Sequence, residues 1–320
     1  MSYLQAIVIA LVQGVTELFP VSSLGHSVLV PAWIGGSWQT LVTQSSQPST
    51  ETSFYLAFIV ALHCATALAL LWFFRADWVR IVRGFFRSVG PTVRERRFVA
   101  RDSDERLAWL IVIATVPVGI TGLALEHVFR TVFAKPLAAS IFLLLNGLIL
   151  LAGERVRRTQ RADVEAAASI QDIEARASGA RTAEEVALAQ ASDQRIARLR
   201  WADGLIVGLF QILALLAGIS RSGVTMVGGL WRGLGHEDAA RFAFLLATPV
   251  ILAAGVLKLP SLFGSAGKHI HGQVAVGVVI TGIAAYLSVR FLVKYFETKT
   301  LTPFAYYCLV VGAASILRFA

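Results

Sequence analysis

Residues 217–225 read Ala217-Gly218-Ile219-Ser220-Arg221-Ser222-Gly223-Val224-Thr225, and they interrupt a long apolar segment of the chain. The residues on either side, 204–216 and 226–230, are apolar enough to predict helix that enters a bilayer. A Ser-Arg-Ser-Gly interruption exposes polar backbone groups, which are tolerated at membrane depth only where they line a cavity inside the protein. An arginine near the bilayer centre is costly and typically marks a functional site. The alternative, a surface loop between soluble helices, is disfavoured by the apolar flanks.

The composition of the whole chain indicates a membrane protein. Of its 320 residues 56% are hydrophobic and 15% are charged, and the mean hydropathy is +0.67. These values are typical of polytopic membrane proteins and exclude an ordinary soluble domain. The net charge of +9 does not predict a nucleic-acid partner, because the basic residues gather between apolar segments, as in cytoplasmic loops. The lipid bilayer is the predicted partner.

A second broken segment lies at the start of the chain, in residues 3–34. Its apolar run is interrupted by Gln13, Glu17, Pro20, Ser22, Ser23, Gly25 and His26. Each broken segment is followed by three unbroken apolar segments long enough to span a membrane. These predicted spans are residues 54–74, 107–125 and 137–153, and then residues 242–259, 274–292 and 303–317.

The distribution of Lys and Arg predicts the topology. Residues 75–106 and residues 154–203 carry nine arginines each, so both stretches are expected on the cytoplasmic side. The loops expected outside hold only Arg130, Lys135 and Lys268. The arginine-rich and arginine-poor loops can lie on opposite sides of the membrane only if each broken segment returns to the side from which it enters. The two broken segments are therefore predicted to be re-entrant hairpins, the first from outside and the second from the cytoplasm.

The predicted fold is an all-α polytopic membrane protein built as an inverted repeat. Because a hairpin plus three spans ends on the opposite side, the second copy must be inverted. Leu11-Val12-Gln13 matches Leu209-Phe210-Gln211, and the sequence at 22–25 matches that at 220–223 at the same offset. Inverted repeats with broken helices place their sites near the midplane. The predicted parts are a first repeat at 1–153 (hairpin 3–34), a cytoplasmic polar helical insertion at 154–203, and a second repeat at 204–320 (hairpin 204–235).

The polar residues of the two breaks suggest an anion site with catalytic groups. Glu17 is the only acidic residue in any predicted membrane segment, and Arg221 is the only base deep within one. Facing each other they would compensate, so a structural ion pair is the plainer alternative. Arginine, hydroxyls and helix N-termini bind phosphate, and an added carboxylate and histidine could cleave a phosphoryl bond. The residues around the pair are Ser22, Ser23, Gly25, His26, Ser220, Ser222, Gly223 and Thr225.

Two motifs resemble the signatures of the bacterial undecaprenyl-diphosphatase family of the bacitracin-resistance type. The first is residues 13–26, Gln-Gly-Val-Thr-Glu-Leu-Phe-Pro-Val-Ser-Ser-Leu-Gly-His, and the second is residues 218–225. The resemblance implies removal of the terminal phosphate from undecaprenyl diphosphate, which recycles the lipid carrier for cell-wall synthesis. It also implies a location in the bacterial inner (plasma) membrane, a site facing outward, and a divalent cation, Mg²⁺ or Ca²⁺.

By this resemblance Glu17 is expected to be the essential carboxylate and Arg221 the clamp on the diphosphate. Ser23 and His26 are the candidates for nucleophile and proton-transfer partner, and which of them attacks stays open. The expected phosphate-binding residues are Ser22, Gly25, Ser220, Ser222, Gly223 and Thr225. Glutamate is often found in the family where this chain has Gln13, so Glu17 is the main candidate metal ligand and Gln13 a weak one.

A transporter or flippase of a lipid-linked phosphate is the alternative function. The inverted repeat fits it equally well, and such a protein needs the anion clamp but not Glu17 and His26 beside it. The sequence leaves open the prenyl chain length that is accepted, the role of the insertion, and whether the chain forms a homodimer.

Overall fold

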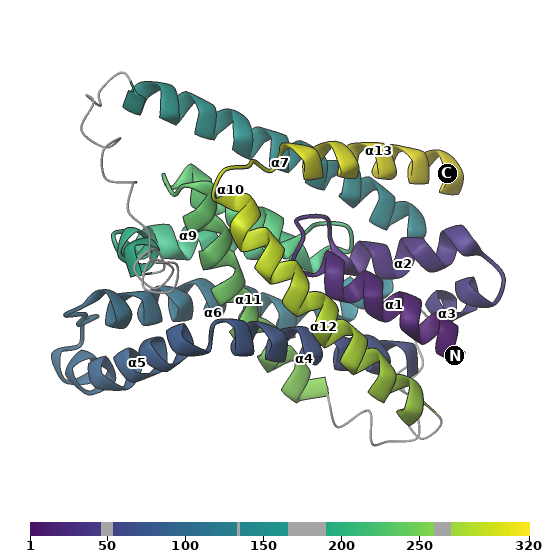
Figure 1. Ribbon diagram of the computed structural model, residues 1–320, viewed down its shortest axis with the longest axis horizontal. Helices are drawn as coiled ribbons and strands as arrows, with labels where there is room; N and C mark the ends of the chain where they lie inside the picture. Colours follow the sequence, from purple (N-terminus) through teal and green to yellow (C-terminus); the bar gives the residue numbers. More distant parts are fainter. Residues whose placement is uncertain (46–53, 133–134, 166–189, 259–269) are drawn as a thin grey trace.

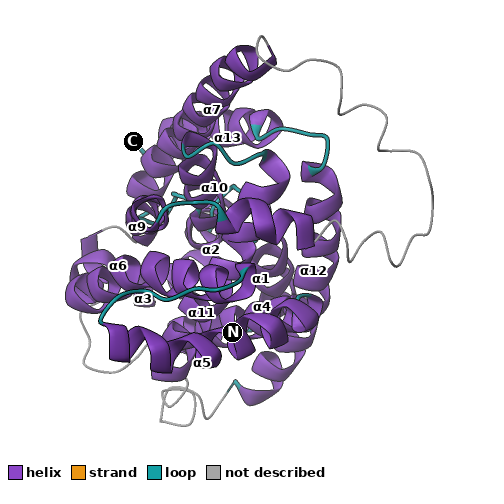
Figure 2. Cartoon of the chain, turned by 90° about the vertical axis from the view of Figure 1, so that its left-hand side faces the viewer, coloured by secondary structure: helices purple, strands orange, loops and turns teal. Residues whose placement is uncertain are grey.

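The computed structural model describes residues 1–45, 54–132, 135–165, 190–258 and 270–320. Throughout these residues it is built from helices and connecting turns, without strands (Figure 2). Six of the described helices are long and apolar enough to cross a membrane. This confirms the predicted class, an all-α polytopic membrane protein. Each of the six predicted spans lies within one of these helices, to within one residue at its ends.

The first broken segment consists of α1 (Tyr3–Thr16) and α2 (Ser23–Ile34). A capping box starts α1, because Ser2 and Gln5 exchange side-chain and backbone hydrogen bonds. The helix ends before Pro20, and the chain reverses through residues 17–22. Ser22 then caps α2 by accepting a hydrogen bond from the backbone N–H of Gly25 at 3.2 Å.

The first half continues through α3 (Ser37–Ser45), α4 (Phe54–Phe73), α5 (Arg75–Glu95), α6 (Ser103–Val132) and α7 (Pro136–Glu165). The twenty residues of α4, most of them apolar, extend over about 30 Å, the thickness of a hydrocarbon core. The arginine-rich stretch after α4 is not only a loop, since most of it forms α5. Helix α5 packs closely on α6. A Cβ at position 84 would lie 2.9 Å from the backbone of Asp104 and Glu105, so only glycine allows this approach.

The second broken segment consists of α9 (Trp201–Ile212), the short η2 (Leu213–Leu215) and α10 (Arg221–Trp231). Gly218 sits in the break with φ at 118°, a conformation that glycine adopts without strain. A Cβ on Gly218 would also collide with the backbone oxygen of Ala139. The chain ends with α11 (His236–Lys258), α12 (His271–Phe296) and α13 (Thr302–Phe319).

The two halves interlock. Helix α1 packs on α12, where Thr281 donates a hydrogen bond to the Ala10 carbonyl at 2.9 Å. Helix α13 lies along α7 (Figure 1), and Gly147 and Gly312 bring their backbones close. Small residues allow such approach between membrane helices. An inverted symmetry between the halves, and the division into 1–153, 154–203 and 204–320, stay predictions.

The two ends of the polar insertion are part of the helical body. At its start α7 continues to Glu165, and near its end residues 190–197 are helical. Asp193 in this second helix is almost fully buried and pairs with Arg241 of α11 at 2.8 Å and with Arg80 of α5 at 2.7 Å. Hydrogen bonds to Asp238 raise the pKa of Arg195 above its ordinary value. Residues 166–189 lie outside the described part of the chain.

Candidate functional site

The two breaks touch each other through their backbones. The hydroxyl of Ser22 accepts a hydrogen bond from the N–H of Gly218 at 3.1 Å. A Cβ on Gly25 would lie 2.9 Å from the Cα of Gly218, so glycine is needed for this approach. Asn146 of α7 links the same two breaks. Its side chain accepts a hydrogen bond from the N–H of Ser220 and donates one to the carbonyl of Pro20, both at 3.0 Å. The breaks are thus held as one unit.

Both breaks end in a helix that begins with a serine cap. Ser220 caps α10 by accepting from the N–H of Gly223 at 3.2 Å, as Ser22 caps α2. The first helical residues are then Ser23 in α2 and Arg221 in α10. The side chains of both contact Glu17. The carboxylate therefore lies beside two helix N-termini, whose positive ends attract anions.

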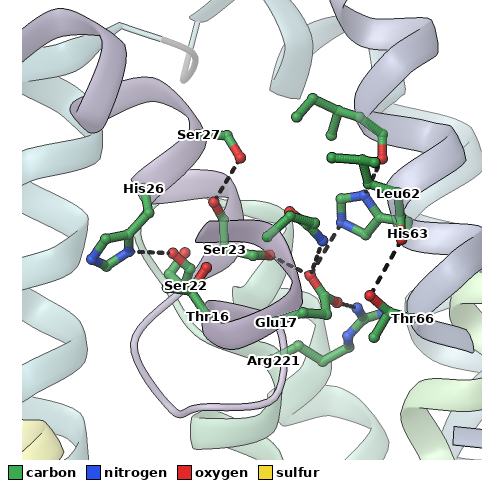
Figure 3. Close-up of polar contacts among 12 residues, drawn as sticks. Thr16, Glu17, Ser22, Ser23, His26, Ser27, Leu62, His63, Thr66 and Arg221 are labelled. Carbon is green, nitrogen blue, oxygen red and sulfur yellow. Dashed lines mark hydrogen bonds and ion pairs between the residues drawn. The ribbon is translucent and has the colours of Figure 1, made fainter. Parts of the chain in front are cut away.

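Glu17 is the centre of the polar cluster drawn in Figure 3. It is 7% exposed, and four side chains reach its two oxygens. Arg221 pairs with Oε1, and Ser23 donates its hydroxyl to Oε2. Gln13 donates to Oε2 at 2.9 Å, and His63 Nε2 lies 3.2 Å from the same oxygen. Three of these partners are on Oε2 and one is on Oε1, so both oxygens of the carboxylate are engaged by side chains.

His26 is not part of this cluster. Its Nδ1 lies 2.7 Å from the carbonyl of Ser22, and its Nε2 lies 2.8 Å from the hydroxyl of Tyr307 in α13. The two rings are stacked with their centroids 5.7 Å apart. In Figure 3 the imidazole lies on the side of Ser22 away from Glu17. The structure thus brings Ser23 to Glu17 but gives His26 other partners at both ring nitrogens.

Most of the other predicted phosphate ligands already make contacts within the protein, and one of them, Thr225, has a hydroxyl without a partner among the described residues. The hydroxyls of Ser220 and Ser222 lie 3.0 Å apart, and both reach the carbonyl of Phe19. Gly223 packs closely on Leu150, because a Cβ added at position 223 would lie 3.1 Å from the Leu150 side chain. The buried hydroxyl of Thr225 has no hydrogen-bond partner among the described residues. Phosphate binding by these residues stays a prediction.

Sequence reasoning assigned no role to Asn146 and Tyr307, and it left His63 open between a packed, hydrogen-bonded histidine and a supporting role at the site. His63 is the only imidazole and Asn146 the only amide in their predominantly apolar predicted spans, and that was the available signal. Tyr307 lies 281 positions from His26, and nothing in its local sequence distinguishes it from other aromatic residues of a span. All three are placed by contacts between helices that are far apart in the chain.

The described residues around Glu17 do not by themselves make a cage for a resident metal ion. Among the described residues there is no group of three or more His, Cys, Asp or Glu side chains that could hold a metal ion. Both oxygens of Glu17 already have side-chain donors. The side-chain oxygen of Gln13 is buried without a hydrogen-bond partner in the described part of the chain, but one amide oxygen does not make a cation cage. A cation at Glu17, with Gln13 as a weak ligand, stays a prediction.

Comparison with known proteins places the chain among named relatives. The model of the family described as bacitracin resistance protein BacA matches residues 6–314. Undecaprenyl-diphosphatase 2 of Frankia alni is 59% identical over all of this chain and 98% of its own length. Undecaprenyl-diphosphatase of Mycolicibacterium paratuberculosis is 56% identical with the same coverage. Undecaprenyl-diphosphatase 2 of Burkholderia lata is 41% identical over 95% of this chain and 92% of its own length.

Proposed function

We propose, because this chain belongs to the bacitracin resistance protein BacA family, that it is a membrane phosphatase acting on undecaprenyl diphosphate. The products are undecaprenyl phosphate and inorganic phosphate, and the lipid product returns to cell-wall synthesis as the carrier. The relatives named undecaprenyl-diphosphatase match over the full chain, which supports the same activity here. The contact between Ser23 and Glu17 is the structural observation that carries the proposal.

Ser23 is the proposed nucleophile, since its hydroxyl is already bonded to a carboxylate that can take its proton. The oxygen attacks the outer phosphorus, the anhydride bond breaks, and undecaprenyl phosphate leaves with the proton that Glu17 took from Ser23. Water then attacks the phosphoserine, Glu17 removes a proton from that water, and Glu17 returns this proton to the Ser23 oxygen as inorganic phosphate is released. His26 is held by Ser22 and Tyr307, so in this scheme it supports the turn and does not attack.

Charge stabilisation is the second part of the proposed mechanism. The transferred phosphoryl group carries its charge on three oxygens, and catalysis of such transfers depends mainly on positioned positive groups. The guanidinium of Arg221 and the N-termini of α2 and α10 surround Glu17, so they are placed to receive the diphosphate next to it. The hydroxyls of Ser222 and Thr225 complete the proposed phosphate ligands.

A divalent cation, Mg²⁺ or Ca²⁺, remains part of the proposal as a partner of the substrate. The family resemblance of the two motifs supports a cation requirement, while the donor set at Glu17 does not fit a resident ion. We therefore propose that the cation is held mainly by diphosphate oxygens. Activity after chelation and after adding back each cation tests this point.

The transporter alternative has no specific observation in its favour. The relatives are named for a phosphatase activity, and Glu17 contacts a hydroxyl, which a binding site for a transported anion does not need.

The proposed location is the bacterial cell membrane, with the insertion in the cytoplasm and the site open to the outside. The positive-inside distribution of arginine supports this orientation.

Phosphate release by the purified full chain in detergent tests the proposed function. The substrate is undecaprenyl diphosphate, and the assay is run with chelator, with Mg²⁺ and with Ca²⁺. We expect stoichiometric release of one phosphate per lipid in at least one cation condition. A monodisperse protein that binds the lipid but releases no phosphate in any condition would refute the proposal.

A further inference from the structure

The guanidinium of Arg221 has two binding partners at the proposed site, Glu17 and the diphosphate. In the structure its guanidinium is paired with Glu17. The proposed function, on which this inference rests, requires the same guanidinium to hold the diphosphate. Glu17 is buried, with 3% of its side chain exposed, and a buried carboxylate is strongly destabilised when its only counter-charge leaves. Binding of the substrate therefore needs a second positive group beside Glu17.

His63 has the geometry of that second group. Its Nδ1 lies 2.8 Å from the carbonyl of Ile59, and because a carbonyl only accepts, Nδ1 carries a proton. Its Nε2 lies 3.2 Å from Oε2 of Glu17. A lone pair on Nε2 facing a carboxylate would be repelled, so a proton must lie between these two atoms. Because Glu17 is also paired with the guanidinium of Arg221, Glu17 is the ionised partner, so the proton belongs to Nε2 and the ring is an imidazolium.

The position of His63 is fixed by the helix and not by the substrate site. The Nδ1 contact is to the carbonyl four residues earlier in α4, so the ring is anchored to its own span. Figure 3 shows His63 and Arg221 approaching Glu17 from different helices, His63 from α4 and Arg221 from α10. Arg221 can thus turn away from Glu17 while His63 stays in place. The charged groups that the contacts place around the ring are Glu17 and Arg221.

We propose that His63 is a positioning residue that becomes the counter-charge of Glu17 when Arg221 moves to the diphosphate. It keeps the carboxylate ionised and oriented toward Ser23, and it lowers the cost of breaking the Glu17–Arg221 pair. Without His63, Glu17 would hold Arg221 more tightly, and the substrate would have to compete for the guanidinium. The loss should therefore appear in diphosphate binding, and it should depend on the carboxylate of Glu17.

A double-mutant cycle on binding tests this coupling. The probe is farnesyl methylenediphosphonate, a diphosphate analogue that is not hydrolysed, titrated into the full chain in detergent. The proteins are wild type, His63→Ala, Glu17→Gln and the double variant. We expect His63→Ala to weaken binding by about tenfold in the wild-type background. In the Glu17→Gln background, where no carboxylate holds Arg221, the same change should alter binding by less than about twofold.

Two further variants separate charge from packing. His63→Gln keeps a side chain of similar reach with a neutral donor, so it should weaken binding nearly as much as alanine, and it replaces alanine in the cycle if His63→Ala does not fold. Cys64→Ala changes the next residue of α4, outside the polar cluster, and should bind as wild type. Equal losses in both Glu17 backgrounds, or unchanged binding by both His63 variants, would overturn the proposal. Wild-type phosphate release from undecaprenyl diphosphate is measured in parallel, so a failure of the proposed function would be seen separately.

Discussion

Ser22 in the first break accepts a hydrogen bond from the backbone N–H of Gly218 in the second, across 196 positions of sequence. The same hydroxyl also caps α2 through Gly25. Ser22 has φ at 71°, an uncommon conformation for a residue with a side chain, and these two hydrogen bonds hold it there. One serine thus fixes the start of α2, which carries Ser23, against the break that carries Arg221. The chemistry of the site depends on this junction.

The first prediction concerns the nucleophile. Ser23→Ala should lower phosphate release by about 10³-fold or more, because no other described hydroxyl is bonded to Glu17. Binding of the non-hydrolysable analogue should stay within a few fold of wild type. His26→Ala should lose at least about tenfold less activity than Ser23→Ala, since both ring nitrogens of His26 have other partners. The reverse order of losses would assign the attack to His26.

The second prediction concerns the carboxylate. Glu17→Gln should lower phosphate release by about 10²-fold or more, because the amide cannot take the proton of Ser23. The variant should still insert into the membrane, since removing a buried charge does not make the segment harder to insert. Turnover is measured with pure protein, and insertion by the amount recovered in the membrane fraction. Near-normal turnover would refute a catalytic role for Glu17.

The third prediction separates charge from shape at Arg221. Lysine keeps the positive charge but loses the planar fork that can bind two oxygens at once. Arg221→Lys should therefore lower kcat/KM by about 10²-fold or more. Ordinary kinetics in this variant would show that a point charge is sufficient at that position.

The fourth prediction concerns stability at the junction of the breaks. Asn146→Ala would leave the N–H of Ser220 and the carbonyl of Pro20 without this partner, at a cost of about 1–3 kcal/mol for each unsatisfied group. The apparent Tm in detergent should fall by roughly 5 °C or more. Ser140→Ala is the matched control on the same helix, because its hydroxyl bonds only the carbonyl of Pro136 one turn away. Equal Tm values for the two variants would contradict the bridging role of Asn146.

The sequence predicted those features that local pattern determines. The six apolar runs of sufficient length are membrane-spanning helices in the structure, and each of the two polar interruptions is a break followed by a helix with a serine cap. The meeting of Glu17 with Arg221 could also be anticipated, since each charge needs a partner at membrane depth. The tyrosine beside His26 and the contact of α1 with α12 could not, because they depend on how spans of similar composition choose their neighbours. Helix α5 was missed because the nine-arginine stretch 75–106, in which it lies, was interpreted as a connecting loop.

The topology is the last prediction, and both the inverted repeat and the outward-facing site depend on it. Single cysteines at Ser46 and Ser265, in a chain lacking Cys64 and Cys308, should react with an impermeant thiol reagent in intact cells. Both positions lie outside the described residues, and the experiment needs only the side of the membrane on which each lies. A cysteine at Ser103, at the start of α6, should react only after the membrane is opened.

These outcomes follow from the number of crossings. Three predicted spans lie between Ser46 and the second hairpin, and one more span lies between that hairpin and Ser265. These four crossings leave Ser46 and Ser265 on the same side only if the second hairpin turns back within the membrane. If residues 204–235 instead crossed fully, the loop containing Ser265 would face the cytoplasm while Ser46 stayed outside. Labelling of Ser46 and Ser265 from opposite sides would therefore refute the inverted repeat. The contact between Glu17 and Arg221 would then need an explanation other than two hairpins that enter from opposite faces.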